Sequence, residues 1–122
     1  MLTIYKSDII SLHTPLTPTT ENLINGKIIS DYLKEGVVIV NTARGKLVNL
    51  DDLKKGLSNG IIKGYLADVL DVEPMPKNYT LKDFDNVIIT PHIGSRTFES
   101  VEKQGSFAVN NLIQMINLHG YE

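Results

Sequence analysis

Three short segments of this chain each carry a side chain suited to proton transfer or to binding an anion. They contain Arg44, Glu73 and His92, and each lies beyond an apolar run that is typical of a buried strand. A guanidinium can hold a carboxylate through two parallel hydrogen bonds, and an imidazole gains and loses a proton near neutral pH. A carboxylate bonded to the second ring nitrogen would fix the tautomer of that imidazole. The three residue types therefore fit acid–base chemistry on a small molecule that bears a carboxylate.

The strands and helices that must position these side chains follow from the apolar periodicity. Strands are expected at residues 8–12, 37–40, within 61–69 and at 87–89, and helices after Asn25, after Asn49 and over 97–118. The alternation of strands and helices predicts an α/β fold with a parallel sheet and right-handed crossovers. Ligands of such sheets bind at the carboxyl ends of the strands. Arg44, Glu73 and His92 are therefore expected to meet in one crevice.

The sequence also predicts burial, a buried acid, an irregular connection and helix N-caps at particular positions. The β-branched run 37–40 is expected to be buried on both faces of the sheet. Asp68 stands in an apolar strand, where a buried acid needs a hydrogen-bonding partner. The connection 71–85 contains two prolines and is expected to be irregular, without a helical crossover. The expected helix N-caps are Asn25, Asn49 and either Ser95 or Thr97.

The composition argues against several classes of protein and site. Of the 122 residues, 42% are apolar and 21% charged, and the net charge is −2, which is ordinary for one globular domain. That charge gives no indication of a nucleic-acid or membrane partner. There is no cysteine, and the three histidines lack metal-ligand spacing, so no metal site is expected. No apolar run reaches a membrane-spanning length and no signal peptide is recognisable, so a cytoplasmic protein is expected.

Three segments carry a resemblance to a known family. They are residues 41–45 (Asn-Thr-Ala-Arg-Gly), 67–74 (Ala-Asp-Val-Leu-Asp-Val-Glu-Pro) and 90–97 (Thr-Pro-His-Ile-Gly-Ser-Arg-Thr). In this order, each after an expected strand, they resemble the NAD(P)-dependent D-2-hydroxyacid dehydrogenases. These oxidoreductases transfer hydride between NAD(P)(H) and a 2-hydroxy or 2-keto acid. The resemblance covers almost the whole chain and implies a Rossmann-type parallel sheet.

The resemblance also implies roles for individual residues. Arg44 would hold the substrate carboxylate and polarise the carbonyl oxygen, His92 would be the acid–base group, and Glu73 would orient its imidazole. These three are the implied catalytic residues. The implied cofactor-binding residues are His13, Thr14, Pro15, Thr42, Ala43, Arg44, Asp68, His92, Ile93, Gly94 and Ser95. The backbone carbonyls of 42–44 would face the nicotinamide ring, and Asp68 would bond its carboxamide.

The resemblance implies only the C-terminal part of the family's cofactor-binding domain. The four strands would make residues 1–122 the C-terminal portion of an NAD(P)-binding Rossmann domain. The first βαβ half, with its Gly-rich phosphate loop, has no counterpart, because no Gly-x-Gly-x-x-Gly segment occurs. The helix 97–118 would cross to an absent substrate domain. We therefore expect this chain alone to bind the cofactor weakly and to be inactive.

Two apolar surfaces would lose their partners in such a partial domain. The strand 8–12 would form an exposed edge of the sheet, and the helix 97–118 would lack the surface on which it docks. Exposed strand edges and apolar faces favour pairing with another chain. A homo-oligomer is therefore expected.

The resemblance favours some substrates and one cofactor over others. Glu73 stands where the related formate dehydrogenases place glutamine, which favours a hydroxy acid. Residues 92–97 most resemble glyoxylate/hydroxypyruvate reductases, while phosphoglycerate, lactate and larger 2-keto acids stay open. NAD is favoured over NADP. The lack of a Gly-x-Ser-x-Gly segment argues against a serine hydrolase, and a non-catalytic remnant or partner-binding piece of the same family stays an alternative.

Overall fold

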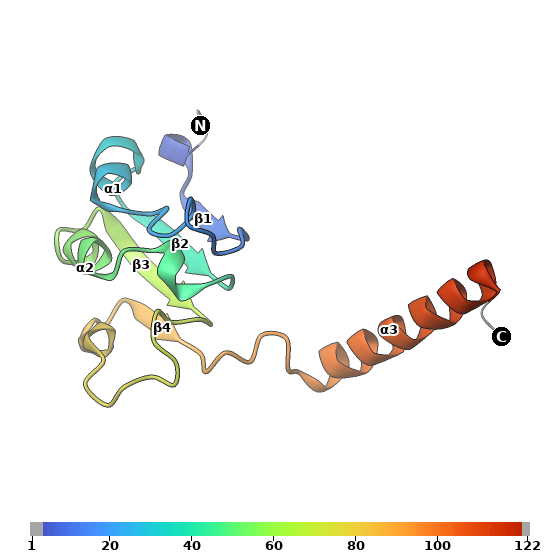
Figure 1. Ribbon diagram of the computed structural model, residues 1–122. Coiled ribbons are helices and arrows are strands. Elements are labelled where there is room, and N and C mark those ends of the chain that lie inside the picture. The colour runs from blue at the N-terminus through green and yellow to red at the C-terminus, as the bar shows by residue number, and fades with distance from the viewer. Residues whose placement is uncertain (1–3, 121–122) are drawn as a thin grey trace. The chain divides into compact units, whose positions relative to one another are not determined.

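The structure is a computed structural model that describes residues 4–120. It divides after Pro91 into two compact units, and each unit is described by itself. The larger unit holds the sheet and two helices, and the smaller unit holds one long helix (Figure 1).

The expected alternation of strands and helices is confirmed. The strands are β1 (Ile9–Leu12), β2 (Val37–Asn41), β3 (Ile62–Ala67) and β4 (Val87–Ile89), and the α-helices are α1 (Gly26–Tyr32), α2 (Leu50–Ser58) and α3 (Phe98–His119). Short 3-10 helices are η1 (Ile4–Lys6), η2 (Gly45–Leu47) and η3 (Thr80–Asp83). All strand pairs are parallel, and the sheet order is β1-β2-β3-β4. The 71–85 connection joins β3 to β4 without an α-helix, as expected.

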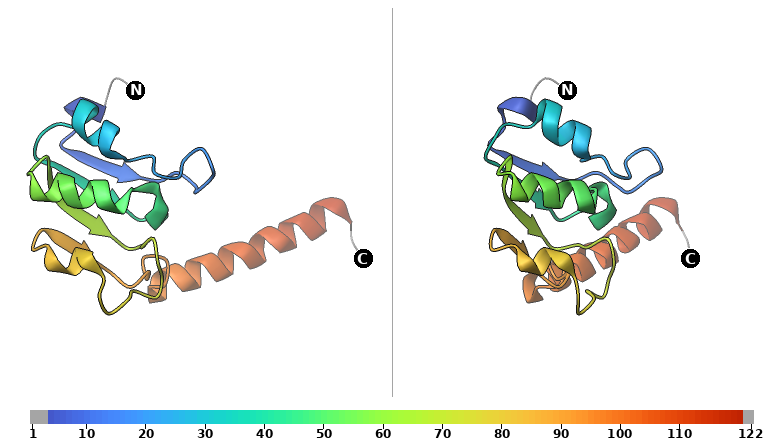
Figure 2. Two further views of the ribbon diagram at one scale, coloured as in Figure 1. Left: turned by 60° about the vertical axis from the view of Figure 1, so that its left-hand side comes forward. Right: turned by 90° about the vertical axis from the view of Figure 1, so that its left-hand side faces the viewer.

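The two crossover helices α1 and α2 lie on the same face of the sheet (Figures 1 and 2). Val37 and Ile39 point to that face and are completely buried, whereas the alternate residues Val38 and Val40 are only half-buried. The prediction that 37–40 is buried on both faces is therefore wrong for this unit. Successive crossovers of one hand, from each strand to the next neighbour in the same direction, place their helices on one side. The opposite face is covered by neither helix.

The uncovered face and the edge of the sheet expose apolar side chains. Ile9 of β1 is 65% exposed and Ile88 of β4 is 61% exposed. Since β1 pairs only with β2, the strand expected to form an edge does so in the unit described. The expected self-association remains a prediction.

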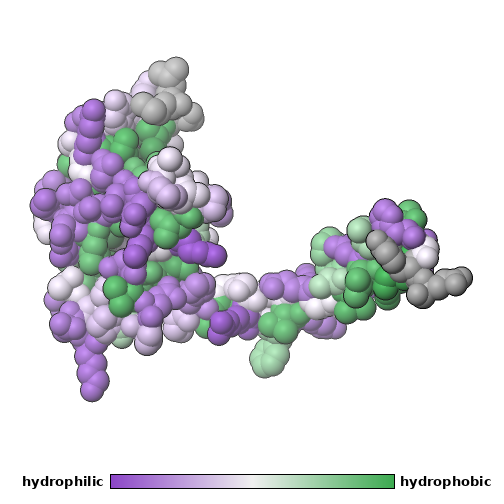
Figure 3. Space-filling model, viewed as in Figure 1, coloured by the Kyte–Doolittle hydropathy of each residue, from purple (hydrophilic) through white to green (hydrophobic). Residues whose placement is uncertain are grey.

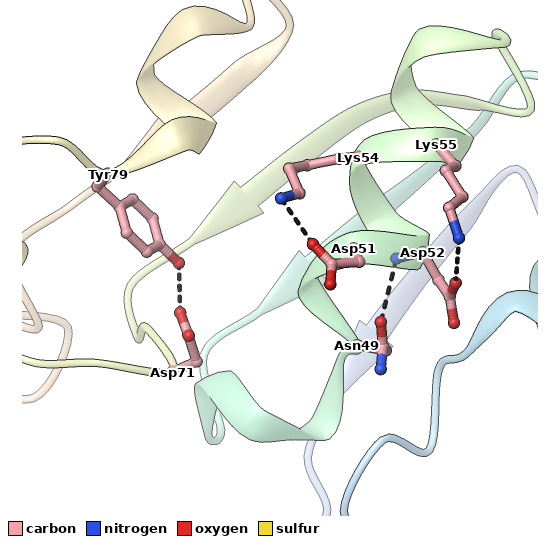
Figure 4. A network of polar contacts seen from close by, with 7 residues as sticks. All are labelled: Asn49, Asp51, Asp52, Lys54, Lys55, Asp71 and Tyr79. Carbon is pink, nitrogen blue, oxygen red and sulfur yellow. Dashed lines mark hydrogen bonds and ion pairs between the residues drawn. The ribbon is translucent and has the colours of Figure 1, made fainter.

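Helix α2 begins and is anchored through side-chain hydrogen bonds that the sequence predicted in part. Asn49 Oδ1 accepts from the backbone N–H of Asp52 at 3.1 Å (Figure 4), and Asn25 caps α1 through Ile28 N–H. Asp52 Oδ2 also accepts from Gly26 N–H at 2.7 Å, which links the starts of the two helices. A carboxylate at these helix starts is favoured by the helix dipoles.

The smaller unit is dominated by α3. Its N-cap is Thr97, whose Oγ1 accepts from Ser100 N–H, so the helix begins one residue later than the predicted 97–118 and ends at His119. Apolar side chains lie at its surface (Figure 3), and Val101 and Leu112 are 57% and 61% exposed. None of the helices among residues 4–120 has the length and hydropathy needed to cross a membrane.

Candidate functional site

A cleft of about 460 Å³ lies beyond the carboxyl ends of β1 and β2. Its lining residues are His13, Thr14, Pro15, Leu16, Thr42, Ala43 and Arg44. Six of these seven are residues that the sequence resemblance implied for the cofactor, and Arg44 is also an implied catalytic residue. The structure therefore brings together the segments 13–15 and 42–44, as predicted. Their role in binding stays a prediction.

The register of the sheet explains why these two segments meet. Leu12 is the parallel partner of Asn41, so both chains leave the sheet at the same level. Sequence analysis missed Leu16, which is 39% exposed in the loop after Pro15. The only signal was an apolar residue in an otherwise polar loop.

Arg44 is an exposed residue in the tight turn that directly follows β2. Its Nη1 donates to the carbonyl of Ala43 at 2.6 Å. The Arg44 carbonyl accepts from Asn41 Nδ2 at 2.9 Å and from Leu47 N–H at 3.2 Å. Because a carbonyl oxygen has two lone pairs, the Arg44 oxygen is fully used inside the protein. That the carbonyls of residues 42–44 face a nicotinamide ring stays a prediction, and the Arg44 side chain lies at the surface.

Asp68 is the buried acid predicted at the end of β3, and it is 9% exposed. Its Oδ1 accepts from the Thr90 hydroxyl at 2.5 Å, and its N–H donates to the Asn41 carbonyl at 3.0 Å. The prediction that this acid has a hydrogen-bonding partner is confirmed. The bond to Thr90 also ties the end of β3 to the end of β4, which places Asp68 at the same edge of the sheet as the cleft.

Glu73 lies in the irregular connection that follows β3. Its Oε1 accepts from Leu70 N–H at 2.7 Å, which closes a turn over residues 70–73. Further along, Tyr79 donates its hydroxyl hydrogen to Asp71 Oδ1 at 2.6 Å (Figure 4). Burial, the hydrogen bond to Asp71 and the charge of Asp71 all raise the pKa of Tyr79, so its hydroxyl stays a donor. These bonds hold the segment that carries Glu73.

His92 begins the smaller unit and has a φ of 55°. Positive φ is uncommon for a residue with a Cβ. In the same unit, Arg96 N–H donates to the Ile93 carbonyl at 2.8 Å, and Gln104 Nε2 donates to the Ser95 carbonyl at 3.3 Å. The predicted residues His92, Ile93, Gly94 and Ser95 thus form a turn that leads into α3. Within residues 4–120, no cluster of three His, Asp or Glu side chains is arranged to hold a metal ion.

The hydroxyl of Tyr65 accepts a hydrogen bond from Asn41 and makes the stability of the larger unit depend on pH. Tyr65 is 2% exposed, and burial, aided by the charge of Asp71 and opposed by the hydrogen bond from Asn41, raises its pKa to about 12. Because the folded-state pKa exceeds the unfolded value of about 10, this stabilisation is complete below pH 10. It is lost as the pH rises toward about 12.

We expect the urea midpoint of the wild-type chain to fall more steeply between about pH 10 and 12 than that of Tyr65→Phe. Tyr79 is retained in both proteins, so its own titration cancels in the comparison. The control is Tyr5→Phe, because Tyr5 is 41% exposed, and this variant should follow the wild type. Equal slopes for wild type and Tyr65→Phe would contradict the expectation.

The sequence of this chain is similar to those of known proteins over most of its length. Residues 3–94 match the family described as "D-isomer specific 2-hydroxyacid dehydrogenase, NAD binding domain". The glyoxylate reductase of Thermofilum pendens is 42% identical over 111 residues, which cover 91% of this chain and 32% of that protein. The D-3-phosphoglycerate dehydrogenase of Haemophilus influenzae is 44% identical over 102 residues, which cover 80% of this chain and 25% of that protein.

A solved structure agrees with these relatives. The crystal structure of a D-isomer specific 2-hydroxyacid dehydrogenase from Xanthobacter autotrophicus Py2, in complex with NADPH and MES, matches 80% of this chain with a TM-score of 0.72. The two are 35% identical, and the match covers 31% of that chain. This chain thus spans about a third or less of the length of these three proteins. The chain belongs to the D-isomer specific 2-hydroxyacid dehydrogenase family, in which it matches the NAD-binding domain.

Proposed function

We propose that this chain supplies the catalytic side of a dehydrogenase that interconverts a small 2-keto acid and the corresponding 2-hydroxy acid. The observation that carries the proposal is the cleft at the ends of β1 and β2, which gathers residues 13–15 with Thr42, Ala43 and Arg44. The surface of this cleft next to the strand ends is formed by small side chains, Thr42 and Ala43, which leave room for a flat ring. The residues present therefore fit a nicotinamide.

The proposed roles follow from the chemistry of the side chains. Arg44 binds the substrate carboxylate and draws electron density from the adjacent carbonyl oxygen. A bound reduced nicotinamide supplies the hydride. His92 gives a proton to the oxygen during reduction and takes it back during oxidation. Glu73 holds the imidazole in the required tautomer, and Asp68 holds the carboxamide end of the ring.

The preferred substrate and cofactor are proposed from the relatives. Glyoxylate and hydroxypyruvate are favoured, since a glyoxylate reductase is 42% identical to this chain. A 3-phosphoglycerate derivative is the second candidate, because a D-3-phosphoglycerate dehydrogenase is 44% identical over a shorter range. NAD is favoured over NADP by the description of the matched family.

We also propose which part of a longer dehydrogenase this chain corresponds to. Residues 1–122 are proposed to be the C-terminal portion of the cofactor domain, and residues 97–118 to cross to a substrate domain. Activity is proposed to require the two-thirds or more of sequence that the relatives carry outside the match. A partner-binding role without catalysis is the second candidate, favoured by the exposed apolar side chains of Ile9, Ile88 and α3.

A graft tests the proposed function. This chain replaces the matching 111 residues of the Thermofilum pendens glyoxylate reductase, and NADH and NADPH oxidation are followed with glyoxylate, hydroxypyruvate and 3-phosphohydroxypyruvate. We expect glyoxylate-dependent oxidation by the graft and none by the 122-residue chain alone. His92→Ala in the graft should lower kcat by about 10²- to 10⁴-fold. A folded graft without activity on any of the three acids would favour the partner-binding role.

A further inference from the structure

Asn41 is a polar residue in a place where the core is otherwise apolar. It ends β2 on the same face as Val37 and Ile39, and all three are 0% exposed. Burying an amide is unfavourable unless its donors and acceptors are bonded. An apolar residue would fill this position without that requirement, so the bonds of the amide explain its presence.

The amide of Asn41 makes three hydrogen bonds, two to the turn that carries Arg44 and one to the neighbouring strand β3. Its Oδ1 accepts from Ala43 N–H at 3.1 Å, and its Nδ2 donates to the Arg44 carbonyl at 2.9 Å. The same Nδ2 donates to the hydroxyl of Tyr65, 3.2 Å away on the neighbouring strand β3. One side chain thus holds the backbone groups on both sides of the Ala43–Arg44 peptide and ties them to the sheet.

The other side of this turn is held by close packing. A Cβ on Gly45 would lie 1.9 Å from the Leu70 carbonyl carbon and 2.2 Å from Asp71 N. The turn is therefore packed against the 70–71 backbone at Gly45 and is hydrogen-bonded to the Asn41 amide at Ala43 and Arg44. The side chain of Arg44 extends to the surface.

We propose that Asn41, through its two bonds to the turn, is a positioning residue for the Arg44 guanidinium. The inference rests on the proposed function, in which Arg44 binds the carboxylate of the substrate. Asn41 does not line the cleft, so its effect passes through the backbone of the turn. Preorganisation of a binding group reduces the ordering that a ligand must impose.

Two variants separate positioning from packing. Asn41→Leu removes the three hydrogen bonds at nearly constant volume but leaves the Tyr65 hydroxyl without its Asn41 donor. The double variant Asn41→Leu with Tyr65→Phe replaces both partners of the Asn41–Tyr65 bond, which removes the cost of an unpaired Tyr65 hydroxyl, so that the missing bonds are those to the turn. Tyr65→Phe alone is the matched control, because it leaves both bonds to the turn in place.

The 122-residue chain is used for the measurements. Urea unfolding gives the stability, amide hydrogen exchange reports the Ala43 N–H, and sodium glyoxylate is titrated while the Nε–Hε signal of Arg44 is observed by NMR. We expect the double variant to be more stable than Asn41→Leu and less stable than the wild type. Its Ala43 amide should still exchange about 10-fold faster than wild type, and glyoxylate should bind about 10-fold more weakly. Tyr65→Phe should keep both properties near the wild-type values.

A double variant with wild-type exchange at Ala43 and wild-type glyoxylate affinity would overturn the proposal, since Asn41 would then be a packing residue only. The proposed function is decided separately, by the activity of the graft, even where the Arg44 signal of the wild-type chain does not respond to glyoxylate. In that case the exchange rate of Ala43 would still decide whether Asn41 holds the turn.

Discussion

Replacing Gly45 with alanine is expected to destabilise the larger unit by about 3 kcal/mol or more. The added methyl group would lie 1.9 Å from the Leu70 carbonyl carbon and 2.2 Å from both Asp71 N and the Leu70 oxygen. These are backbone atoms, so no side-chain rotation relieves the overlap. The turn that carries Arg44 or the segment that leads to Glu73 must move instead, and both movements break hydrogen bonds described above.

Equilibrium unfolding in urea checks this prediction, with Gly64→Ala as the matched control. A Cβ on Gly64 would have Asn86 O as its nearest neighbour at 3.5 Å, an ordinary contact distance. Gly64→Ala should therefore change the free energy of unfolding by less than about 1 kcal/mol. An unchanged midpoint for Gly45→Ala would mean that the close approach of residues 45 and 70 is not required for folding.

Replacing Arg44 with alanine in the active graft is expected to lower kcat/KM for glyoxylate by about 10³-fold or more. The variant loses both the bidentate contact to the carboxylate and the positive charge near the carbonyl oxygen. Arg44→Lys keeps the charge but replaces the planar donor pair with a single ammonium, so it should recover only part of the loss. The dissociation constant for NADH should change little in both variants.

Steady-state kinetics with glyoxylate and NADH titration measure these effects. Lys46→Ala is the control, because Lys46 is an exposed cation two residues further along the same turn and does not line the cleft. A similar loss in Lys46→Ala would show that general electrostatic attraction, rather than a specific contact by Arg44, brings the substrate to the site.

The strands and helices were predictable because their determinants are local. The β-branched run at 37–40 lies within β2, and Asn25 and Asn49 cap α1 and α2 as their sequence positions indicated. The contents of the cleft were also predictable in large part. The parallel order of β1 and β2 follows from the strand–helix–strand pattern, and it alone places residues 13–15 beside residues 42–44.

The burial of the sheet faces was decided by tertiary structure. A run of valine and isoleucine is the same sequence whether one face or two are covered. The half-buried state of Val38 and Val40 depends on both crossover helices lying on one side. Similarly, the Arg44 carbonyl turns toward Asn41 and Leu47 because the η2 turn follows at once, which no property of residues 42–44 by themselves indicates.

The sequence by itself determined the family, the four parallel strands and the residues that surround the cleft, since these depend on short motifs and on periodicity along the chain. Only the tertiary structure decided what supports the turn of Arg44. The Asn41–Tyr65 bond joins positions 24 residues apart, and Gly45 meets Leu70 from another segment. Such contacts depend on the register and spacing of neighbouring strands, because side chains distant in sequence become neighbours only when the sheet has formed.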